Sequence, residues 1–170
     1  MGNVILIGMP GAGKSTIGVV LAKIWGYQFI DSDLLIQAQE GKVLSSLIKE
    51  HGVEGFLKIE NQVNAGIWTD HAVISTGGSI CYCDEALRHL RESGPLVYLK
   101  LDYNVIRRRV GSLTDRGVAM RNGKSLRDLY EERVPLYEKY ADITVDLTGM
   151  RLQKSIRLVQ QKVEAYLSAD

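Results

Sequence analysis

The sequence predicts an α/β protein, in which a five-stranded parallel sheet lies between two layers of helices as a three-layer α/β/α sandwich. Two observations predict this fold. Short apolar segments alternate along the chain with longer segments of helical periodicity, as in consecutive right-handed β-α-β units. Each apolar segment is nearly continuous, which is typical of strands that helices cover on both faces.

The strands are expected at residues 4–7, 27–30, 72–75, 96–101 and 143–145. Helices are expected at 14–25, from about 84, at 104–110, at 126–140, and after the last strand to about 167. We expect the first helix to turn one face toward the sheet, made of Ile17, Val20, Leu21 and Ile24. Together these elements predict a single domain over residues 1–170.

Two stretches depart from this alternation. Residues 33–69 predict an all-helical insertion, with two or three helices that are broken near Gly41 and Gly52. Residues 111–124 are polar, carry Arg116 and Arg121 among glycines, and show little apolar periodicity. The composition of this second stretch is typical of a mobile loop.

Composition limits the kinds of function. The chain has 170 residues, of which 45% are hydrophobic, and its 21 basic and 20 acidic side chains leave a formal charge of +1. This balance provides no global field that would attract nucleic acid or a membrane surface. No apolar run approaches the roughly 18 residues that span a bilayer. We therefore expect a cytoplasmic protein without nucleic-acid or membrane partners. The protein is also expected to be a monomer.

The two cysteines, Cys81 and Cys83, are separated by a single residue. This spacing does not match a zinc half-site, and the sequence has no second pair to complete a tetrahedral site. We expect reduced thiols, and a local redox or soft-metal role is the alternative interpretation.

A glycine-rich run between the first strand and the first helix carries the strongest chemical signal. It reads Gly8-Met9-Pro10-Gly11-Ala12-Gly13-Lys14-Ser15-Thr16 and fits the pattern G-x-x-x-x-G-K-[ST]. In such a loop, successive backbone N–H groups point at phosphate oxygens, the lysine reaches the β- and γ-phosphates, and the serine ligates Mg²⁺. A chance glycine turn does not explain why strand, loop and helix occur in order, so the chain is predicted to bind a nucleoside triphosphate.

Polar clusters also follow the second and third strands, at Asp31-Ser32-Asp33 and Thr76-Gly77-Gly78. Because the carboxyl ends of parallel strands meet at one edge of a sheet, we expect these clusters and the glycine-rich loop to face one crevice. Carboxylates two residues apart point in different directions, so Asp31 suits Mg²⁺ or its waters and Asp33 suits a substrate hydroxyl. The alternatives are that Ser32 or Asp33 only caps a helix, and that the glycines only form a turn.

Further motifs occur, together with these, in the order found in shikimate kinases, and the whole chain resembles that family. They are Gly55-Phe56 with Glu60, Ser75-Thr76-Gly77-Gly78-Ser79, Arg116, and Glu132-Arg133-Val134-Pro135-Leu136-Tyr137 followed by Tyr140-Ala141-Asp142. The last of these is much more specific than a phosphate-binding loop alone. The resemblance implies a P-loop NTPase of the nucleoside-monophosphate-kinase type, with a substrate-binding insertion at 33–69 and a lid at 111–124.

The resemblance also implies the reaction, which is transfer of the γ-phosphate of ATP to a hydroxyl of a small polyol carboxylate, most simply shikimate, with Mg²⁺ as cofactor. It assigns Lys14, Ser15 and Asp31 to phosphate and metal, and Arg109 and Arg116 to adenine and phosphates. The substrate site is assigned to Asp33, Glu60, Gly77, Gly78 and Arg133. As alternatives, Arg107 and Arg108 form a solvated helix face, and Arg133 only pairs with Glu132 or Glu138 on its own helix.

Three positions depart from the family pattern. The motif Phe-Arg-x-x-Glu reads Phe56-Leu57-Lys58-Ile59-Glu60, so Leu57 replaces the arginine that clamps the substrate carboxylate in the family. Lys58 lies about 100° around the helix and substitutes only if the helix is rotated or reshaped. The run of three glycines ends in Ser79, and Gly117 stands where a proline is expected.

Because all three changes lie where the substrate or the lid is expected, the reaction type is better defined than the acceptor. Other small-metabolite kinases, such as a gluconate-type or nucleoside-monophosphate kinase, and a regulatory nucleotide-binding module are the alternatives. A nucleoside-monophosphate kinase needs several lid arginines, which Arg116 and Arg121 supply only in part. A module that only binds nucleotide has no need of Asp33.

Overall fold

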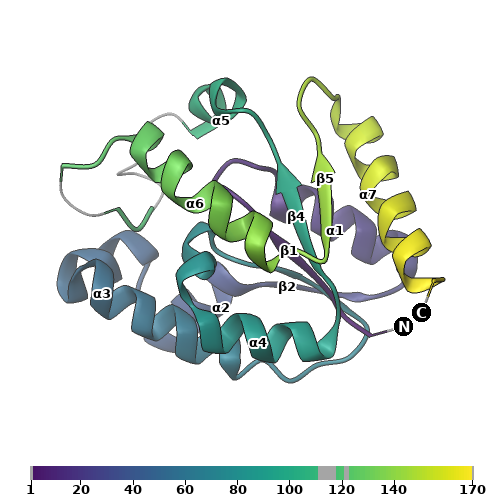
Figure 1. The fold of residues 1–170 in the computed structure, drawn as a ribbon. Coiled ribbons are helices and arrows are strands. Elements are labelled where there is room, and N and C mark those ends of the chain that lie inside the picture. The colour runs from purple at the N-terminus through teal and green to yellow at the C-terminus, as the bar shows by residue number, and fades with distance from the viewer. Residues whose placement is uncertain (1, 111–117, 121–122, 170) are drawn as a thin grey trace.

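A computed structural model describes residues 2–110, 118–120 and 123–169. As predicted, its five parallel strands form one sheet, and the structure shows that their order is β2-β3-β1-β4-β5 (Figure 1). The strands are β1 (Val4–Ile7), β2 (Gln28–Asp31), β3 (Ala72–Ser75), β4 (Leu96–Lys100) and β5 (Ile143–Asp146). Leu6 of β1 and Asp31 of β2 are both in register with Ser75 of β3, so these strands end at the same edge.

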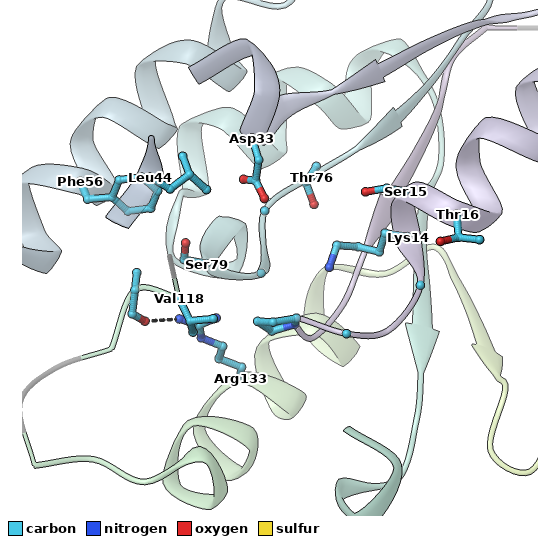
Figure 2. A pocket seen from close by; sticks show the side chains of 16 residues that line it. Lys14, Ser15, Thr16, Asp33, Leu44, Phe56, Thr76, Ser79, Val118 and Arg133 are labelled. Carbon is cyan, nitrogen blue, oxygen red and sulfur yellow. Dashed lines mark hydrogen bonds between the residues drawn. The ribbon is translucent and has the colours of Figure 1, made fainter. Parts of the chain in front are cut away.

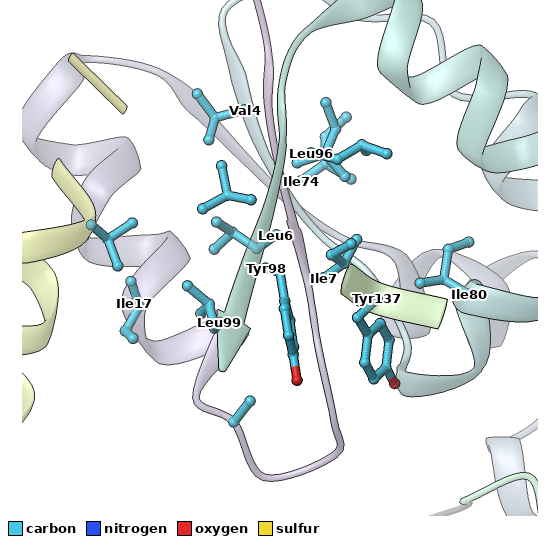
Figure 3. Packing of buried hydrophobic residues seen from close by; sticks show 14 of the residues in the cluster. Val4, Leu6, Ile7, Ile17, Ile74, Ile80, Leu96, Tyr98, Leu99 and Tyr137 are labelled. Carbon is cyan, nitrogen blue, oxygen red and sulfur yellow. The ribbon is translucent and has the colours of Figure 1, made fainter. Parts of the chain in front are cut away.

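Helices cover both faces of the sheet and complete the predicted three-layer sandwich. On one face, α1 (Lys14–Trp25) packs against α7 (Leu152–Leu167), and on the other lie α4 (Asp84–Ser93) and α6 (Leu126–Tyr140) (Figure 1). The short helix α5 (Tyr103–Val110) follows β4, and a 3₁₀ helix, η1 (Gly78–Tyr82), follows β3. Figure 3 shows the resulting core, with Leu6 facing Ile17 of α1 on one side of the sheet and Ile7 facing Tyr137 of α6 on the other.

The insertion consists of α2 (Ser32–Glu40) and α3 (Leu44–Ala65), which pack against each other. The predicted breaks are confirmed: α2 ends at Gly41, and α3 is kinked at Gly52, where φ is 68°. Such positive φ angles are accessible to glycine without a Cβ penalty. Within the described residues, no helix combines the length and the apolar character that a membrane crossing needs.

One prediction for α1 is wrong. Ile24, which we placed on the buried face, is 48% exposed, whereas Gly18 is buried. At Gly18, a Cβ atom would lie 2.8 Å from the ring of Phe29, so the missing side chain lets the sheet approach this part of the helix. The buried positions of α1 thus include Gly18, whereas Ile24, close to the C-terminal end of the helix, is exposed.

The predicted loop at 111–124 is described only in part. Residues 118–120, 123 and 124 belong to the structure, but Arg116 and Arg121 lie outside the described residues. The lid and the role of Arg116 in closing over phosphates therefore stay predictions.

Candidate active site

A cavity of about 320 Å³ lies at the edge where β1, β2 and β3 end. It is lined by Pro10, Gly11, Gly13, Lys14, Ser15, Thr16, Asp33, Leu44, Phe56, Thr76, Gly77, Gly78, Ser79, Val118, Ala119 and Arg133 (Figure 2). The glycine-rich loop, the acidic cluster and the Thr76-Gly77-Gly78 turn thus face one crevice, as predicted from the strand ends.

The glycine-rich loop curls as its motif predicts. Gly11 and Gly13 have φ angles of 78° and 94°, and Gly13 is the N-cap of α1. The Nζ atom of Lys14 donates hydrogen bonds to the carbonyl oxygens of Gly8 at 2.8 Å and Met9 at 3.0 Å. Within the loop, Ala12 is buried, and its N–H donates to the carbonyl of Met9. Figure 2 shows the Lys14 side chain directed into the cavity, where burial lowers its pKa to about 8.

Asp31 and Ser15 meet at the floor of this loop. The Ser15 hydroxyl donates to Oδ2 of Asp31 at 2.6 Å and lies 3.2 Å from the hydroxyl of Ser75. The other oxygen of Asp31 accepts from the backbone N–H groups of Asp33 and Leu34, so Asp31 is the N-cap of α2. The alternative that Ser32 or Asp33 is the cap is wrong, because α2 begins at Ser32, directly after Asp31.

Capping by Asp31 leaves the Asp33 side chain available to the cavity. Figure 2 shows its carboxyl group directed inward from the side opposite Arg133, facing the same space as Lys14. Burial raises the pKa of Asp33 to about 6, and the nearby positive charge of Lys14 partly opposes that rise. The two carboxylates therefore point to different places, as their spacing predicts.

Arg133 reaches the cavity from α6 and is only 1% exposed. Its Nη2 atom donates to the carbonyl oxygen of Ala119 at 2.6 Å, and its guanidinium lies over the ring of Tyr82. The alternative of a simple pair along its helix is not borne out within the described residues, since Glu138 pairs with Lys100 and Glu132 with Lys124. The Nε atom of Arg133 is buried without a partner there, which leaves a donor for a ligand.

Glu60 lies behind the cavity wall, next to the cavity-lining residue Gly77. Glu60 is completely buried and is not among the cavity-lining residues. A Cβ atom at Gly77 would lie 2.5 Å from Oε1 of Glu60 and 2.7 Å from Oδ1 of Asp33. At Gly78, a Cβ atom would lie 2.6 Å from Pro10 of the phosphate loop. Glycine is therefore required at both positions by close packing of the site's own residues.

The remaining predicted positions lie around this cavity. Arg109 is exposed beside the phosphate loop, and its Nη1 atom donates to the carbonyl of Gly11 at 3.3 Å. Arg107 and Arg108 are exposed, and Arg108 donates to Asn104 on its own helix. Lys58 is exposed and borders an outer groove on α3. It therefore does not replace the positive charge that is missing at Leu57.

The two cysteines are free and buried near the site. Their thiols donate to backbone carbonyls, that of Cys81 to Gly78 and that of Cys83 to Leu57 and Ser79. Burial raises the pKa of Cys81 to about 12, so the thiol stays protonated at neutral pH. Among the described residues, no group of three or more His, Cys, Asp or Glu side chains could hold a metal ion.

Sequence reasoning missed several residues that shape the cavity. Leu44 and Phe56 form an apolar wall, and the hydroxyl of Ser32 accepts from the N–H of Gly77 at 3.3 Å. The buried hydroxyl of Tyr137 donates to the carbonyl of Gly78. Phe56 and Tyr137 stand in motifs that the sequence showed, but nothing in the spacing indicated these contacts.

A phosphate loop that faces a buried acid across one small cavity suits phosphoryl transfer from ATP to a small alcohol. The fold and the site thus define an ATP-dependent small-molecule kinase. The profile of one family, described as shikimate kinase, matches residues 10–164 of the chain, which therefore belongs to the shikimate kinase family.

Individual relatives agree with this assignment. A shikimate kinase of Chlorobium chlorochromatii is 33% identical, over 96% of this chain and 92% of that protein. The structure of a shikimate kinase from Acinetobacter baumannii in complex with shikimate has a TM-score of 0.86 and 28% identity, covering 100% of this chain and 95% of that one. A shikimate kinase from Aquifex aeolicus has a TM-score of 0.82 and 28% identity, covering 97% and 98%.

Proposed function

We propose that this kinase transfers the γ-phosphate of ATP to a hydroxyl of shikimate. One observation carries the proposal: Asp33, Lys14 and Arg133 converge on the same cavity from three different elements. Family membership and the similarity to a shikimate-bound kinase support shikimate as the acceptor. The cavity of about 320 Å³ matches a small ligand.

Each of these side chains has a distinct role in the proposal. Lys14 binds the β- and γ-phosphates and neutralises charge that develops during transfer. Asp33 orients the acceptor hydroxyl and takes its proton as the new P–O bond forms. Arg133 binds the acceptor carboxylate, for which its buried guanidinium and partnerless Nε supply donors. Gly77 and Gly78 contact the face of the acceptor ring, with Glu60 supporting them from behind.

The residues present also fit Mg²⁺. The hydroxyl of Ser15 and the carboxylate of Asp31 are hard oxygen ligands at the base of the phosphate loop, and Mg²⁺ takes one or two such protein ligands together with phosphates and water. We propose that Ser15 binds the ion directly and that Asp31 binds its waters. Bound there, Mg²⁺ would neutralise phosphate charge and favour the in-line geometry.

Three further assignments belong to the proposal. Arg109, beside the phosphate loop, stacks on the adenine of ATP. The phosphates of ATP are bound by the loop residues Gly11, Ala12, Gly13 and Thr16. Residues 33–69 bind the acceptor, while residues 111–124 cover the phosphates with Arg116, whose replacement by alanine should lower kcat more than ATP affinity. The enzyme is also proposed to act as a monomer in the cytoplasm, whose reducing environment suits the free thiols of Cys81 and Cys83.

The test is ADP release with Mg-ATP and a panel of acceptors: shikimate, quinate, gluconate, homoserine and nucleoside monophosphates. We expect turnover with shikimate and little with nucleoside monophosphates, which offer no carboxylate to Arg133. Quinate, gluconate and homoserine carry both a carboxylate and a hydroxyl, so they test whether the shape of the cavity selects shikimate. If the enzyme turns over an alcohol without a carboxylate but not shikimate, that alcohol is the acceptor and the proposal of shikimate is wrong. ATP binding without turnover of any acceptor would instead support a regulatory module.

A further inference from the structure

Ser79 connects the cavity to the buried carboxyl group behind it. The side chain lines the cavity between Asp33 and Arg133, as Figure 2 shows, and is 5% exposed. Its hydroxyl donates a short hydrogen bond of 2.5 Å to Oε2 of Glu60. A glycine at this position, as in the family pattern, would leave that carboxyl oxygen without this donor.

Glu60 depends on this hydrogen bond to an unusual degree. The residue is completely buried, and its other oxygen, Oε1, has no hydrogen-bond partner. The ion pairs of the described residues do not include Glu60. A buried carboxyl group without a bound cation is costly, so a single donor has a large influence on where that group lies.

The position of Glu60 matters for the acceptor side of the cavity. Its Oε1 atom and the Oδ1 atom of Asp33 both crowd the α-carbon of Gly77, at 2.5 and 2.7 Å from the place of a Cβ atom. A displaced Glu60 side chain would therefore push on Gly77, on Asp33, or on both. Through these contacts, the hydrogen bond from Ser79 acts on the residues that hold the acceptor hydroxyl.

The residue at position 57 lies one turn before Glu60 on α3, so the two are neighbours on the helix surface. An arginine at 57 could provide the cation that Glu60 lacks, whereas Leu57 cannot, and Lys58 is exposed on the outer side of the helix. Two of the three departures of this chain, Leu57 and Ser79, thus meet at one carboxyl group.

We propose that Ser79 is a positioning residue of the acceptor site, whose hydroxyl holds Glu60 in the place that a cation at position 57 would otherwise secure. This inference deepens the proposed function and rests on it for its kinetic test. It makes the two departures interdependent: either a hydroxyl at 79 or a guanidinium at 57 is sufficient to order Glu60, and loss of both disorders the acceptor site.

The kinetic test compares Ser79→Gly, Leu57→Arg and the double variant. Ser79→Gly should raise the KM for shikimate about tenfold or more, the range for loss of a hydrogen bond to a charged group, and leave the KM for ATP unchanged. Leu57→Arg should lower the KM for shikimate by a larger factor in Ser79→Gly than in the parent, because an arginine at 57 can bind the acceptor carboxylate in both proteins but replaces a lost partner of Glu60 only in Ser79→Gly. An unchanged KM in Ser79→Gly, an equal rise for ATP and shikimate, or a factor for Leu57→Arg that is no larger in Ser79→Gly than in the parent would overturn the inference.

Two controls separate positioning from damage to the fold. Ser79→Ala also lacks the hydroxyl but keeps Cβ, so it should match Ser79→Gly in kinetics. Ser155→Ala removes an equally buried serine hydroxyl, on α7 and far from the cavity, and should leave both KM values unchanged. Similar losses in Ser155→Ala and Ser79→Ala would mean that the effect is general destabilisation.

A second readout does not depend on the acceptor. Carbon-detected NMR titration of the Glu60 carboxyl group should show a higher pKa in Ser79→Ala than in the parent, and a value lowered again when Leu57→Arg is added. The groups that face Glu60 and stay constant in this comparison are Asp33 on α2, Lys14 on α1, Arg133 on α6, and the thiols of Cys81 and Cys83. An unchanged titration would overturn the inference even if shikimate is turned over, whereas a parent enzyme inactive on shikimate but with the expected shifts would overturn only the proposed acceptor.

Discussion

The two sides of the cavity are built in different ways. The phosphate side, residues 8–16, is one continuous segment that lines the cavity and carries a single lysine. The acceptor side consists of Asp33, Glu60, residues 77–79 and Arg133, which come from four separate elements. The phosphate side keeps its whole motif, whereas the departures at 57 and 79 fall on the acceptor side. A backbone cradle tolerates little change, while a set of contacting side chains can exchange one hydrogen bond for another.

The largest effect is expected on the phosphate side. Lys14→Ala should lower kcat by a factor of about 10³, because Lys14 is the buried cation of the loop and no other described residue of that segment carries a charge. Steady-state kinetics at saturating ATP would measure it, with Lys23→Ala at the exposed end of α1 as a control that keeps the parent rate. A substantial residual rate would mean that the phosphates are bound elsewhere.

The next effect tests whether the acceptor side also carries chemistry. Asp33→Asn should lower kcat at least a hundredfold, since the amide cannot accept the proton of the acceptor hydroxyl. The affinity for ATP, measured by calorimetry, should be unchanged. If ATP affinity and kcat fell together, Asp33 would belong to the phosphate side, which would contradict its assignment to the acceptor side of the cavity.

A smaller effect is expected for recognition of the acceptor carboxylate. Arg133→Lys keeps the charge but loses the planar donor pair, and the shorter reach also loses the hydrogen bond to Ala119. We expect the KM for shikimate to rise roughly tenfold with the KM for ATP unaffected. An acceptor KM that does not move would place the carboxylate away from Arg133.

The smallest effect concerns stability and pH. Burial raises the pKa of Glu60 to about 7, from 4.5 in an exposed carboxyl group, so the folded chain holds this proton more tightly than the unfolded chain. The stability that this group contributes is therefore full below pH 4.5 and is lost as pH rises through 7. Between these limits the loss is on the order of 3 kcal/mol.

Urea unfolding of Glu60→Gln and of the parent at pH 5 and pH 8 measures this contribution. The parent should lose more stability than the variant between the two values, because the amide does not titrate. Parallel losses in both proteins would show that Glu60 is already ionised at pH 5, as a paired carboxylate would be.

Much of this protein could be predicted from local pattern. The strand and helix positions, the breaks at Gly41 and Gly52, and the phosphate loop all follow from periodicity and turn chemistry over a few residues. Parallel strands also predict that Asp33 and Gly77 share an edge with that loop, since strand ends align. Ile24 shows the limit, because periodicity places it on the same helix face as the buried Ile17, whereas its own side chain is 48% exposed.

The sequence by itself determined the fold class, the family and the residue types at the site. Only the tertiary structure decided that Ser15 is bonded to Asp31, that Arg133 is buried against Tyr82, and that Ser79 is bonded to Glu60. The contacts of Arg133 and Ser79 join residues that lie far apart along the chain. Their geometry depends on how whole helices pack on the sheet, because local spacing orients a side chain only relative to its own helix or strand.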